Sequence, residues 1–452
     1  MIDMVMQDKR EALHGHLHFQ ICLQNRVSHV KCSFSHENTP ACSGGSTEGS
    51  SMYQLSSAVL SAITKVAKVN LLEHSEGPSQ SIIKAVSGLS EMFTRNGQVG
   101  SRVYFEDPQL CAGYLVYYLP VNLAKVQILL DELQPVLPVA QDQDFRVLDL
   151  GGGPGTGVLG VLDWCLSKSA RPPSTLRMIA VDRSPHVLRV STDIWRAYSE
   201  QQRDQSIPPL NTVECNLERS LPSAIRDGGG VNGYQLIIVQ NLLSELFVGS
   251  MDSVGQRTAL IGELLNYLAP EGSLMLIEPA TRPASRELHQ VRDNLLAGRH
   301  CSVYAPCLHD APCSALVKPD DWCHEERKWE NPAWIAQVDR RVGLIKDALK
   351  FSYVIFRKDG KTLVPRDPDY HRVVSELRVM KGEKRVWLCD QTGRSEIGRQ
   401  DKESSMSNTA FDGWHRGAII RVSDIVRKER KGRPAMVGRI ISSGTVEIVR
   451  SA

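Results

Sequence analysis

The sequence lacks the long apolar run that a membrane helix needs, since no stretch approaches ~18 consecutive apolar residues. It also lacks a basic segment followed by an apolar stretch near its start, so no secretory signal is visible. Its 11 cysteines in 452 residues are too sparse for a disulfide scaffold. We therefore expect a protein without membrane spans in a reducing compartment, where clustered cysteines bind metal more often than they form disulfides.

A strong charge of either sign is also missing, because the net charge is +2 with 42% hydrophobic and 23% charged residues. The balance is uneven along the chain. Residues 381–452 hold 15 Lys and Arg against 9 Asp and Glu, so the tail carries +6 and the rest −4. A basic tail suits an anionic partner such as RNA, although a solvated basic face would have the same composition.

We expect five segments along the chain. They are a disordered leader over 1–51, a helical region over 52–140, an α/β domain over 141–299, a cysteine-rich segment over 300–350 and a basic β-rich domain over 351–452. In the α/β domain, apolar strands at 145–150, 178–182, 236–239 and 274–278 alternate with helices at 158–166, 185–197 and 255–268. This alternation predicts a doubly wound parallel sheet. Further helices are expected near 80–95 and 108–134, and strands of the β-rich domain at 353–356, 385–388, 418–421 and 445–449.

A glycine-rich turn, Gly151-Gly-Gly-Pro-Gly-Thr-Gly157, follows the first strand directly after Asp149. Glycines at a helix N-terminus let a ligand approach free N–H groups. A dinucleotide fold would require Gly where the chain has Thr156. The spacing of Gly151, Gly153 and Gly155 instead resembles the cofactor loop of class I S-adenosylmethionine-dependent methyltransferases. The alternative is a turn built only for tight strand–helix packing.

Two more residues belong to this predicted cofactor site. Asp182 ends the next strand, where a carboxylate with two acceptor oxygens suits the ribose diol. Asn241 follows the strand at 236–239. No catalytic residue can be assigned: Glu245 and Glu278 are candidate general bases and equally candidate structural carboxylates, and no Pro-Cys or Thr-Cys nucleophile follows a late strand.

Three cysteines, Cys307, Cys313 and Cys323, lie within seventeen residues beside Pro and His. Their spacing differs from the tight C-x2–4-C pairs of structural zinc sites, whereas iron–sulfur clusters accept more varied spacing. Cys301 and Cys389 are both candidates for a fourth ligand, and His309 and His324 would suit zinc. Unrelated reduced cysteines are the remaining interpretation.

The segment Val303-Tyr-Ala-Pro-Cys307-Leu-His-Asp-Ala-Pro-Cys313 with Asp321-Trp-Cys323-His resembles the signature of the ribosomal small-subunit protein 22 family. The resemblance extends to Leu148-Asp-Leu-Gly-Gly-Gly-Pro-Gly-Thr, to Asn241-Leu-Leu-Ser-Glu-Leu and to Ile277-Glu-Pro, and so spans about 100–390. It implies a class I methyltransferase fold with a four-iron–four-sulfur cluster. On this resemblance Cys307, Cys313 and Cys323 are the first three ligands and Cys389 is the fourth.

The family resemblance also implies binding to the small ribosomal subunit and its rRNA during maturation. We expect an S-adenosylmethionine-binding, iron–sulfur-containing assembly or translation factor, monomeric away from the ribosome, with zinc as the alternative metal. An active rRNA methyltransferase is the second hypothesis, and a small-molecule methyltransferase the third, which the basic tail disfavours. We expect a cytoplasmic, bacterial-type location, with the mitochondrial matrix left open.

Overall fold

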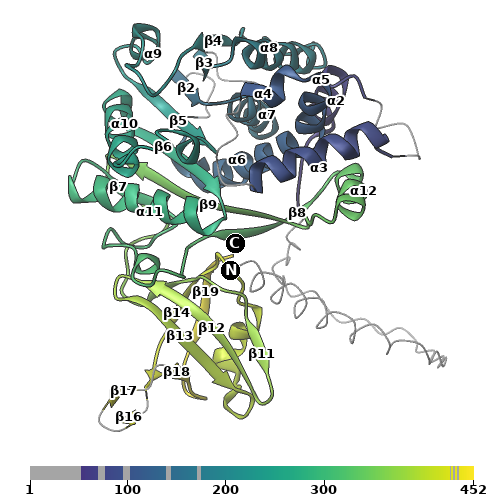
Figure 1. Cartoon of the computed structure of the whole chain (residues 1–452). Helices are drawn as coiled ribbons and strands as arrows, with labels where there is room; N and C mark the ends of the chain where they lie inside the picture. Colours follow the sequence, from purple (N-terminus) through teal and green to yellow (C-terminus); the bar gives the residue numbers. More distant parts are fainter. Residues whose placement is uncertain are drawn as a thin grey trace, which may run out of the picture. The chain divides into compact units, whose positions relative to one another are not determined.

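The computed structural model describes residues 52–69, 77–94, 102–138, 144–169, 175–427, 429–430, 433–434 and 437–451. The leader predicted over 1–51 lies outside these residues. The described residues belong to one compact unit, in which two separate β-sheets carry most of the strands (Figure 1).

The larger sheet has nine strands. In order these are β4 (Asn211–Glu214), β3 (Thr175–Asp182), β2 (Asp144–Leu150), β5 (Tyr234–Gln240), β6 (Leu268–Pro279), β9 (Ala348–Arg357), β8 (Glu325–Glu330) and β1 (Tyr53–Gln54), while β7 (Ser302–Ala305) pairs with β9 off this path. The strands from β4 to β6 are parallel, and β9 runs antiparallel to β6. The direction of the strand order reverses at β2, as in doubly wound sheets. This order, with an antiparallel strand beside the last parallel one, confirms the class I methyltransferase fold.

Alternating apolar residues give the large sheet two buried faces. Val147 and Met178 belong to one core, and their neighbours Leu148 and Ile179 belong to the other. Successive side chains of a strand point to opposite faces, so a strand covered on both sides reads as a continuous apolar run. This is why the parallel strands were recognisable from the sequence.

Helices cover both faces of this sheet (Figure 1). The first core takes residues from α2 (Ser57–Val66), α3 (Gln80–Thr94), α4 (Arg102–Glu106), α5 (Pro108–Gly113), α6 (Leu119–Leu133), α7 (Thr156–Ser169), α8 (Pro185–Ser199) and α12 (Ala333–Val342). The second takes residues from α9 (Ser223–Gly228), α10 (Ser253–Tyr267) and α11 (Arg282–Ala297). None of the described helices is long and apolar enough to span a bilayer.

The helical region predicted over 52–140 packs on the sheet through the first core. A π-helical turn, η1 (Tyr114–Tyr118), joins α5 to α6, and short 3-10 helices are η2 (Gln134–Val136), η3 (Leu243–Glu245), η4 (Ser314–Leu316), η5 (Asp401–Glu403) and η6 (Met406–Gly413). Since 13 of the 15 residues of α6 are buried, the N-terminal helices complete the methyltransferase-like core and have no separate one among the described residues.

The second sheet confirms the β-rich C-terminal region. Its strands are β10 (Tyr370–Val373), β11 (Arg378–Met380), β12 (Glu383–Asp390), β13 (Gly393–Gln400), β14 (Ile419–Val422), β15 (Ile425–Val426), β18 (Val437–Ile440) and β19 (Val446–Arg450), and β16 (Glu429–Arg430) pairs with β17 (Arg433–Pro434). It has its own core, which includes Val386, Leu388, Phe411 and Trp414.

The boundaries predicted at 300 and 351 differ from the structure. The strand at 353–356, predicted for the β-rich domain, is part of β9 and lies between β6 and β8 in the large sheet. Likewise β7 and β8 arise from the segment predicted to be irregular. An apolar run indicates a buried strand, but the partner strand is chosen by tertiary packing, which the run does not encode.

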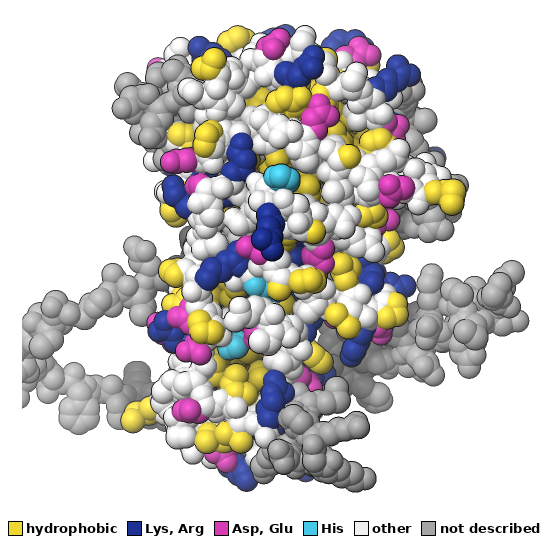
Figure 2. Space-filling view, turned by 90° about the vertical axis from the view of Figure 1, so that its left-hand side faces the viewer, with side chains coloured by type: hydrophobic (Ala, Val, Ile, Leu, Met, Phe, Trp, Pro, Cys, Tyr) yellow, Lys and Arg dark blue, Asp and Glu magenta, His cyan; other side chains and the backbone are white. Residues whose placement is uncertain are grey.

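Charged side chains are mixed on the face shown in Figure 2, where Lys and Arg alternate with Asp and Glu. A few basic side chains lie close together near the middle of this face, with histidines nearby. No continuous basic field covers it. By sequence the surplus of basic residues lies in residues 381–452, where the side chains of 428–436 are not described.

Candidate functional site

The glycine turn lies between the end of β2 and the start of α7. Gly151, Gly153 and Gly155 all have left-handed backbone, with φ of +64°, +53° and +90°, which glycine adopts without steric cost. A Cβ on Gly151 would lie 2.7 Å from the Leu242 side chain, and one on Gly155 would lie 2.4 Å from Ser191 Oγ. The turn therefore requires glycine at these positions.

Asp149 lies beneath this turn and is 1% exposed. Its Oδ2 accepts the N–H groups of Gly157 (3.0 Å) and Val158 (3.2 Å) in the first turn of α7. Its Oδ1 is buried without a hydrogen-bond partner among the described residues. Burial raises the pKa of Asp149 to about 7. One oxygen thus fixes the helix start, and the other remains available to a donor or a cation.

Asp182 and Asn241 extend the site along the carboxyl edge of the sheet. Asp182 accepts N–H groups from Gly153 (3.2 Å) and Ser184 (2.9 Å), and burial raises its pKa. Asn241 has φ of +52°, and its Oδ1 is buried without a partner among the described residues. Because β3, β2 and β5 are adjacent and parallel, their ends bring all six predicted cofactor residues to one edge.

An aromatic group beside the turn was not anticipated from the sequence. Tyr104, Phe105 and Tyr114 contact one another, with ring centroids 4.3 to 5.6 Å apart. The Phe105 ring lies 4.0 Å from where a Cβ on Gly153 would be. Burial raises the pKa of Tyr104 and Tyr114, and Glu245 and Asp182 add to this. In the sequence, the cluster of tyrosines over 104–118 was the signal from which this aromatic group could have been predicted.

The two candidate general bases differ in their surroundings. Glu278 is buried, and its carboxylate accepts N–H groups from Leu242 (3.0 Å) and Leu243 (2.8 Å). It therefore holds the loop that follows β5. Burial raises the pKa of Glu278. Glu245 lies on that loop, within electrostatic range of Tyr114.

Lys125, on α6, is a buried amine near the same edge that sequence reasoning missed. Its Nζ donates to Asn122 Oδ1 at 3.0 Å, and the backbone oxygen of Asn122 accepts from Gln240 at 3.0 Å. Burial lowers the pKa of Lys125 to about 7, with nearby Lys346 acting in the same direction. An apolar helix with a single lysine on its buried face was the only sequence signal.

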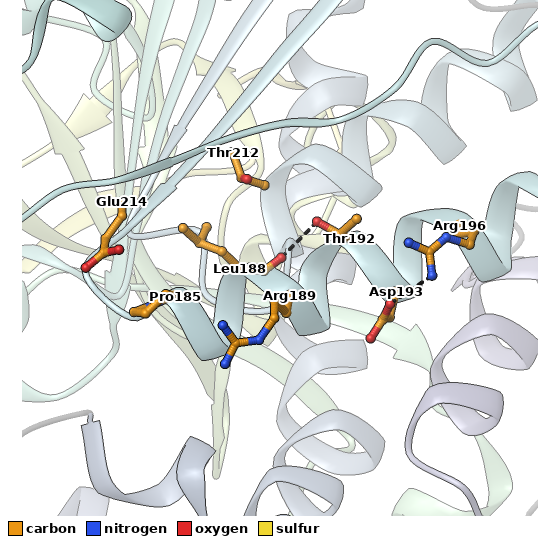
Figure 3. Close-up of a pocket in the computed structure, with 8 residues that line it drawn as sticks. All are labelled: Pro185, Leu188, Arg189, Thr192, Asp193, Arg196, Thr212 and Glu214. Atoms are coloured by element: carbon orange, nitrogen blue, oxygen red, sulfur yellow. Dashed lines mark hydrogen bonds and ion pairs between the residues drawn. The ribbon is translucent and has the colours of Figure 1, made fainter.

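Two open hollows lie at the β3–β4 side of the sheet. The first, of ≈ 510 Å³, lies between α8 and β4 (Figure 3) and is lined by Pro185, Leu188, Arg189, Thr192, Asp193, Arg196, Thr212 and Glu214. The second, of ≈ 500 Å³, includes Arg183, next to Asp182. The first hollow is lined by none of the predicted cofactor residues. Its charged residues pair on the helix surface, as Arg196 does with Asp193 at 3.1 Å. The second borders the predicted ribose carboxylate.

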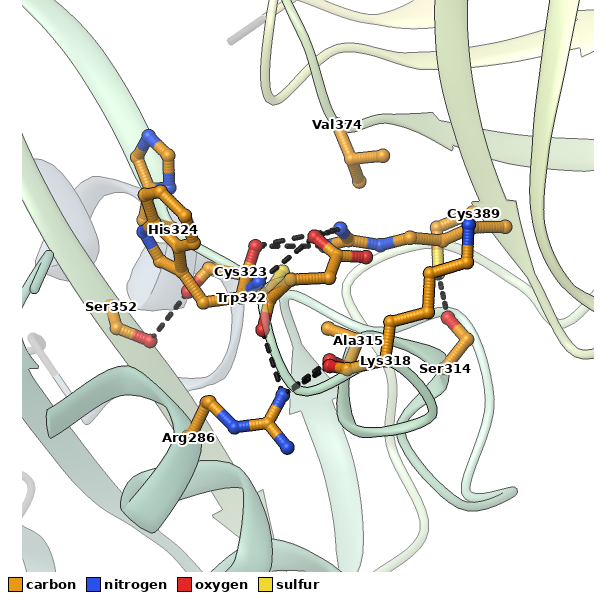
Figure 4. Close-up of polar contacts among 12 residues, drawn as sticks. Arg286, Ser314, Ala315, Lys318, Trp322, Cys323, His324, Ser352, Val374 and Cys389 are labelled. Atoms are coloured by element: carbon orange, nitrogen blue, oxygen red, sulfur yellow. Dashed lines mark hydrogen bonds and ion pairs between the residues drawn. The ribbon is translucent and has the colours of Figure 1, made fainter. Parts of the chain in front are cut away.

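The four predicted ligand cysteines converge from two parts of the fold. Cys307, Cys313 and Cys323 lie in the loops between β7 and β8, and Cys389 lies on β12. Cys389 Sγ is 3.6 Å from Ser314 Oγ (Figure 4). Burial raises the pKa of Cys301, the alternative fourth ligand, to about 11, and Asp310 raises it further whereas Arg292 lowers it.

The thiols of this cluster interact with one another. Burial is the largest cause that raises the pKa of Cys313, Cys323 and Cys389, the last to about 12, and each is raised further by Cys307. Cys323 also raises the pKa of Cys313 and Cys389. As they stand, no three His, Cys, Asp or Glu side chains of the described part of the chain are grouped closely enough to hold a single metal ion.

Arginines hold the cysteine loops in place. Arg286 donates to the carbonyl oxygens of Lys318 (2.7 Å) and Asp321 (2.8 Å), as Figure 4 shows. Arg292 donates to those of Ala311 and His309. The histidines proposed for zinc are placed differently: His309 is buried within the loop, whereas His324 stacks on Trp322 and pairs with Glu326 at 3.2 Å.

Known proteins resemble this chain in sequence and in fold. Residues 108–404 match the family model described as mitochondrial small ribosomal subunit Rsm22. No curated protein matches the chain.

Solved structures with a similar arrangement are methyltransferases of low identity. An O-methyltransferase family protein from Burkholderia thailandensis is 16% identical, with 62% of this chain and 72% of that chain covered and a TM-score of 0.30. Magnesium protoporphyrin IX methyltransferase from Synechocystis is 10% identical, with 63% and 99% covered and a TM-score of 0.30. Precorrin-6y C5,15-methyltransferase from Geobacter metallireducens is 13% identical, with 51% and 85% covered and a TM-score of 0.29. These likenesses are distant, and the strand order carries the fold assignment.

Proposed function

This chain belongs to the family of the mitochondrial small ribosomal subunit protein Rsm22, and from that membership we propose that it is an S-adenosylmethionine-binding, iron–sulfur-containing factor of the small ribosomal subunit. The family match covers every predicted cofactor and cysteine position. The observation that carries the proposal is that Cys307, Cys313, Cys323 and Cys389 lie close enough to interact with one another, in a chain that also has a methyltransferase-type cofactor edge.

The cofactor edge fits S-adenosylmethionine. The unpartnered Oδ1 of buried Asp149 suits a cationic amino group. The turn leaves room for a ligand at Gly153, where the nearest atom to an added Cβ would be on the Phe105 ring at 4.0 Å. Asp182 is positioned to accept the ribose hydroxyls, and Asn241 Oδ1 is a further open acceptor. When bound, the cofactor supplies an electrophilic methyl group. The residues of this chain bind and orient it.

We propose an iron–sulfur cluster rather than a single zinc ion at these cysteines, because their spacing differs from the tight pairs of structural zinc sites. Zinc requires all four sulfurs about 2.3 Å from one point. A four-iron cluster gives each thiolate its own iron, so the sulfurs stand farther apart. Metal-bound thiols are deprotonated, so bound metal cations would have to overcome the burial that raises the pKa of Cys313, Cys323 and Cys389.

The carboxylates near the edge favour a binding role over catalysis. Glu278 accepts the backbone N–H groups of the loop after β5, and the Phe105 ring lies 4.0 Å from a Cβ position on Gly153. We therefore propose a role in assembly or translation. An active rRNA methyltransferase is the second candidate, because the chain combines the methyltransferase fold with membership of a small ribosomal subunit family.

The partner and location follow from the family. Its description names the mitochondrial small ribosomal subunit, and we propose rRNA as the partner of the basic tail and the mitochondrial matrix as the location. The family description gives no support to the cytoplasmic location expected from the sequence. Of the tail residues, Lys428 and Lys431 lie outside the described residues.

The deciding experiment is the iron, sulfide and zinc content of anaerobically purified protein with its visible spectrum. We expect about four irons and four sulfides per chain and a brown absorbance. Cys313→Ser should be colourless and less stable, because ligation free energy is partly folding free energy. Cys301→Ser, a cysteine outside the cluster, is the matched control and should stay brown. A brown Cys313→Ser protein would refute the ligand set.

Methyl transfer is tested separately. If rRNA from cells lacking the protein keeps all its methyl groups, and the purified protein transfers none, the second candidate fails. If ribosomal fractions lack the protein, the first candidate fails as well.

A further inference from the structure

Gln240, the last residue of β5, keeps a buried oxygen without a donor. The residue is only 8% exposed. Its Nε2 donates to the backbone oxygen of Asn122 at 3.0 Å, whereas its Oε1 is buried and has no hydrogen-bond partner among the described residues. A backbone carbonyl oxygen can only accept, so the amide nitrogen must face Asn122 and the orientation of the amide is fixed. Burying an acceptor without a donor is costly, so a ligand that donates to Oε1 would be favoured.

Gln240 and Asp149 lie on the same face of the large sheet, on neighbouring strands. In the parallel register of β2 and β5, Asp149 lies opposite Ile238, two residues before Gln240. Side chains two residues apart on a strand point to the same face, and Ile238 belongs to the first core. The Oδ1 of Asp149, like the Oε1 of Gln240, is buried without a partner in the described part of the chain. Two open acceptors therefore share one face at the carboxyl edge of the sheet.

The chain that follows Gln240 borders the glycine turn. A Cβ on Gly151 would lie 2.7 Å from the Leu242 side chain, so the two backbone segments are in close contact. Between them, Asn241 Oδ1 is a third buried oxygen without a partner among the described residues. The end of β5 and the glycine turn are thus neighbouring walls of the predicted cofactor site.

Helix α6 holds the amide of Gln240 in place. Asn122, which accepts from Gln240, is 7% exposed, and its own side chain is fixed at both polar atoms. Lys125 Nζ donates to Asn122 Oδ1 at 3.0 Å, and Asn122 Nδ2 donates to Tyr114 OH at 3.5 Å. The helical N-terminal region therefore supports the end of β5, and with it the predicted cofactor edge.

We propose that Gln240 Oε1 and Asp149 Oδ1 together accept the α-ammonium group of the cofactor, and that Gln240 makes the site selective for ligands that carry this group. The inference depends on the S-adenosylmethionine binding proposed above. An ammonium group has three N–H donors and no acceptor, so it suits a place where unpartnered oxygens gather. Hydrogen bonds from a charged donor are also stronger than neutral ones. A buried water molecule is the alternative donor, and in that case Gln240 would have no effect on ligand selectivity.

The test combines one change in the protein with one change in the ligand. The protein change is Gln240→Met, which keeps the length of the side chain and removes the acceptor oxygen. The ligand change is from S-adenosylhomocysteine to its deaminated analogue, in which a hydrogen replaces the α-ammonium group. Affinities of the full chain are measured by displacement of radiolabelled S-adenosylhomocysteine, which also reports weak ligands.

We expect Gln240→Met to weaken S-adenosylhomocysteine binding about tenfold or more, as the loss of a hydrogen bond to a charged group does. Its affinity for the deaminated analogue should change less than about twofold, which also shows that the variant is folded. Gln240→Asn, with an amide on a shorter side chain, should show the same pattern and replaces Gln240→Met if that variant folds poorly. Gln235→Met is the matched control, because Gln235 lies at the other end of β5 and accepts the N–H of Arg146 at 2.7 Å. It should bind both ligands as wild type does.

The outcomes separate the two proposals. Wild-type protein that binds neither S-adenosylmethionine nor S-adenosylhomocysteine overturns the cofactor site and this inference with it. Wild-type protein that binds S-adenosylhomocysteine and its deaminated analogue equally well overturns the inference alone, since the ammonium group then contributes nothing. So does an equal loss of affinity for both ligands in Gln240→Met, which would mean that Gln240 only supports the fold of the site. Unchanged affinity of Gln240→Met for both ligands also overturns the inference and leaves a water molecule as the donor.

Discussion

Asp149 shows how burial turns a common residue into a specialised one. Its carboxylate fixes the first turn of α7 with Oδ2 and leaves Oδ1 unpaired in the interior. The cost of burying this charge appears as a pKa of about 7. Sequence spacing identified the residue, but the spacing contains no information about the unpaired oxygen.

We predict that Asp149→Asn weakens S-adenosylmethionine binding at least about tenfold. At pH 8 the fold should be as stable as wild type or up to about 4 kcal/mol more stable, since the pKa of about 7 lies about three units above that of a free Asp and one unit corresponds to about 1.4 kcal/mol. Calorimetric titration with the cofactor and urea unfolding measure the two effects. Asp193→Asn, on the exposed face of α8, is the control and should change neither.

The same residue predicts a pH dependence. Because the folded pKa of Asp149 is raised above the unfolded value, the folded state holds this proton more tightly. The contribution of Asp149 to stability is therefore present below the unfolded pKa of about 4 and is lost as pH rises to about 7. The difference in unfolding free energy between wild type and Asp149→Asn, measured by urea unfolding from pH 4.5 to 8, should fall across this window. A flat difference would contradict the buried charge.

At the scale of elements, a buried ion network joins the two sheets. Glu325 on β8 pairs with Arg327 at 2.9 Å and with Arg372 on β10 at 3.1 Å. Arg327 also pairs with Glu132 on α6 at 2.9 Å, and Tyr353 on β9 donates to Glu132 at 2.8 Å. The members come from four elements, so this network depends on how the elements pack.

We predict that Glu325→Gln destabilises the protein by about 3 kcal/mol, because it leaves two buried guanidinium groups short of an anion. The neighbouring arginines hold the pKa of Glu325 below its usual value although burial opposes this. Its stabilisation is thus present above the unfolded pKa of about 4.3 and is lost as pH falls through the folded pKa. Urea unfolding at pH 7 and pH 4 tests both points. Lys65→Ala, which breaks the exposed pair with Glu200, should cost under about 1 kcal/mol.

At the scale of the whole molecule, the cysteine cluster is a second link between the sheets. Three of the proposed ligands come from loops between β7 and β8 of the large sheet, and the fourth, Cys389, comes from β12 of the C-terminal sheet. Arg394 on β13 adds a further contact, since it pairs with Asp321 at 2.6 Å. Filling such a centre would fasten the two sheets together.

We predict that metal removal loosens the C-terminal sheet and spares the large one. Amide hydrogen exchange should become faster in 306–324 and in β10, β12 and β13, and should stay unchanged in β2, β3 and β5, whose cores are separate. Cys301→Ser carried through the same removal should behave as wild type. Equal exchange in the metal-loaded and metal-free forms would show that the buried ion network alone joins the sheets.

For the basic tail, we predict that affinity for a small-subunit rRNA fragment falls steeply with salt, since Lys and Arg side chains that neutralise phosphates release counterions. The salt dependence is measured as the slope of log affinity against log salt concentration. Replacing Arg427, Arg430 and Arg433 with Gln should reduce the steepness of this slope by about one unit for each phosphate that the variant no longer neutralises. Binding measured between about 50 and 200 mM salt tests this, and a slope unchanged by the substitutions would place the RNA-binding surface elsewhere.

Some parts of the fold and of the candidate site could be predicted from the sequence, and others could not. The strands of the parallel sheet are continuous apolar runs, and the glycine turn follows from backbone geometry that only glycine adopts easily, so both were predictable. The place of β9 was not, since its apolar run would suit either sheet. Lys125 and the aromatic group were missed because a buried lysine and clustered tyrosines become a site only through their neighbours.

By itself the sequence determined the local chemistry of this protein: where the chain turns, which runs are buried, and which residues can ligate metal or accept a hydrogen bond. Only the tertiary structure decided that β9 joins the large sheet and that Glu325 and Arg372 form a buried pair between the two sheets. The physical reason is that a residue type fixes what a group can bind, whereas burial and packing fix which partners it has.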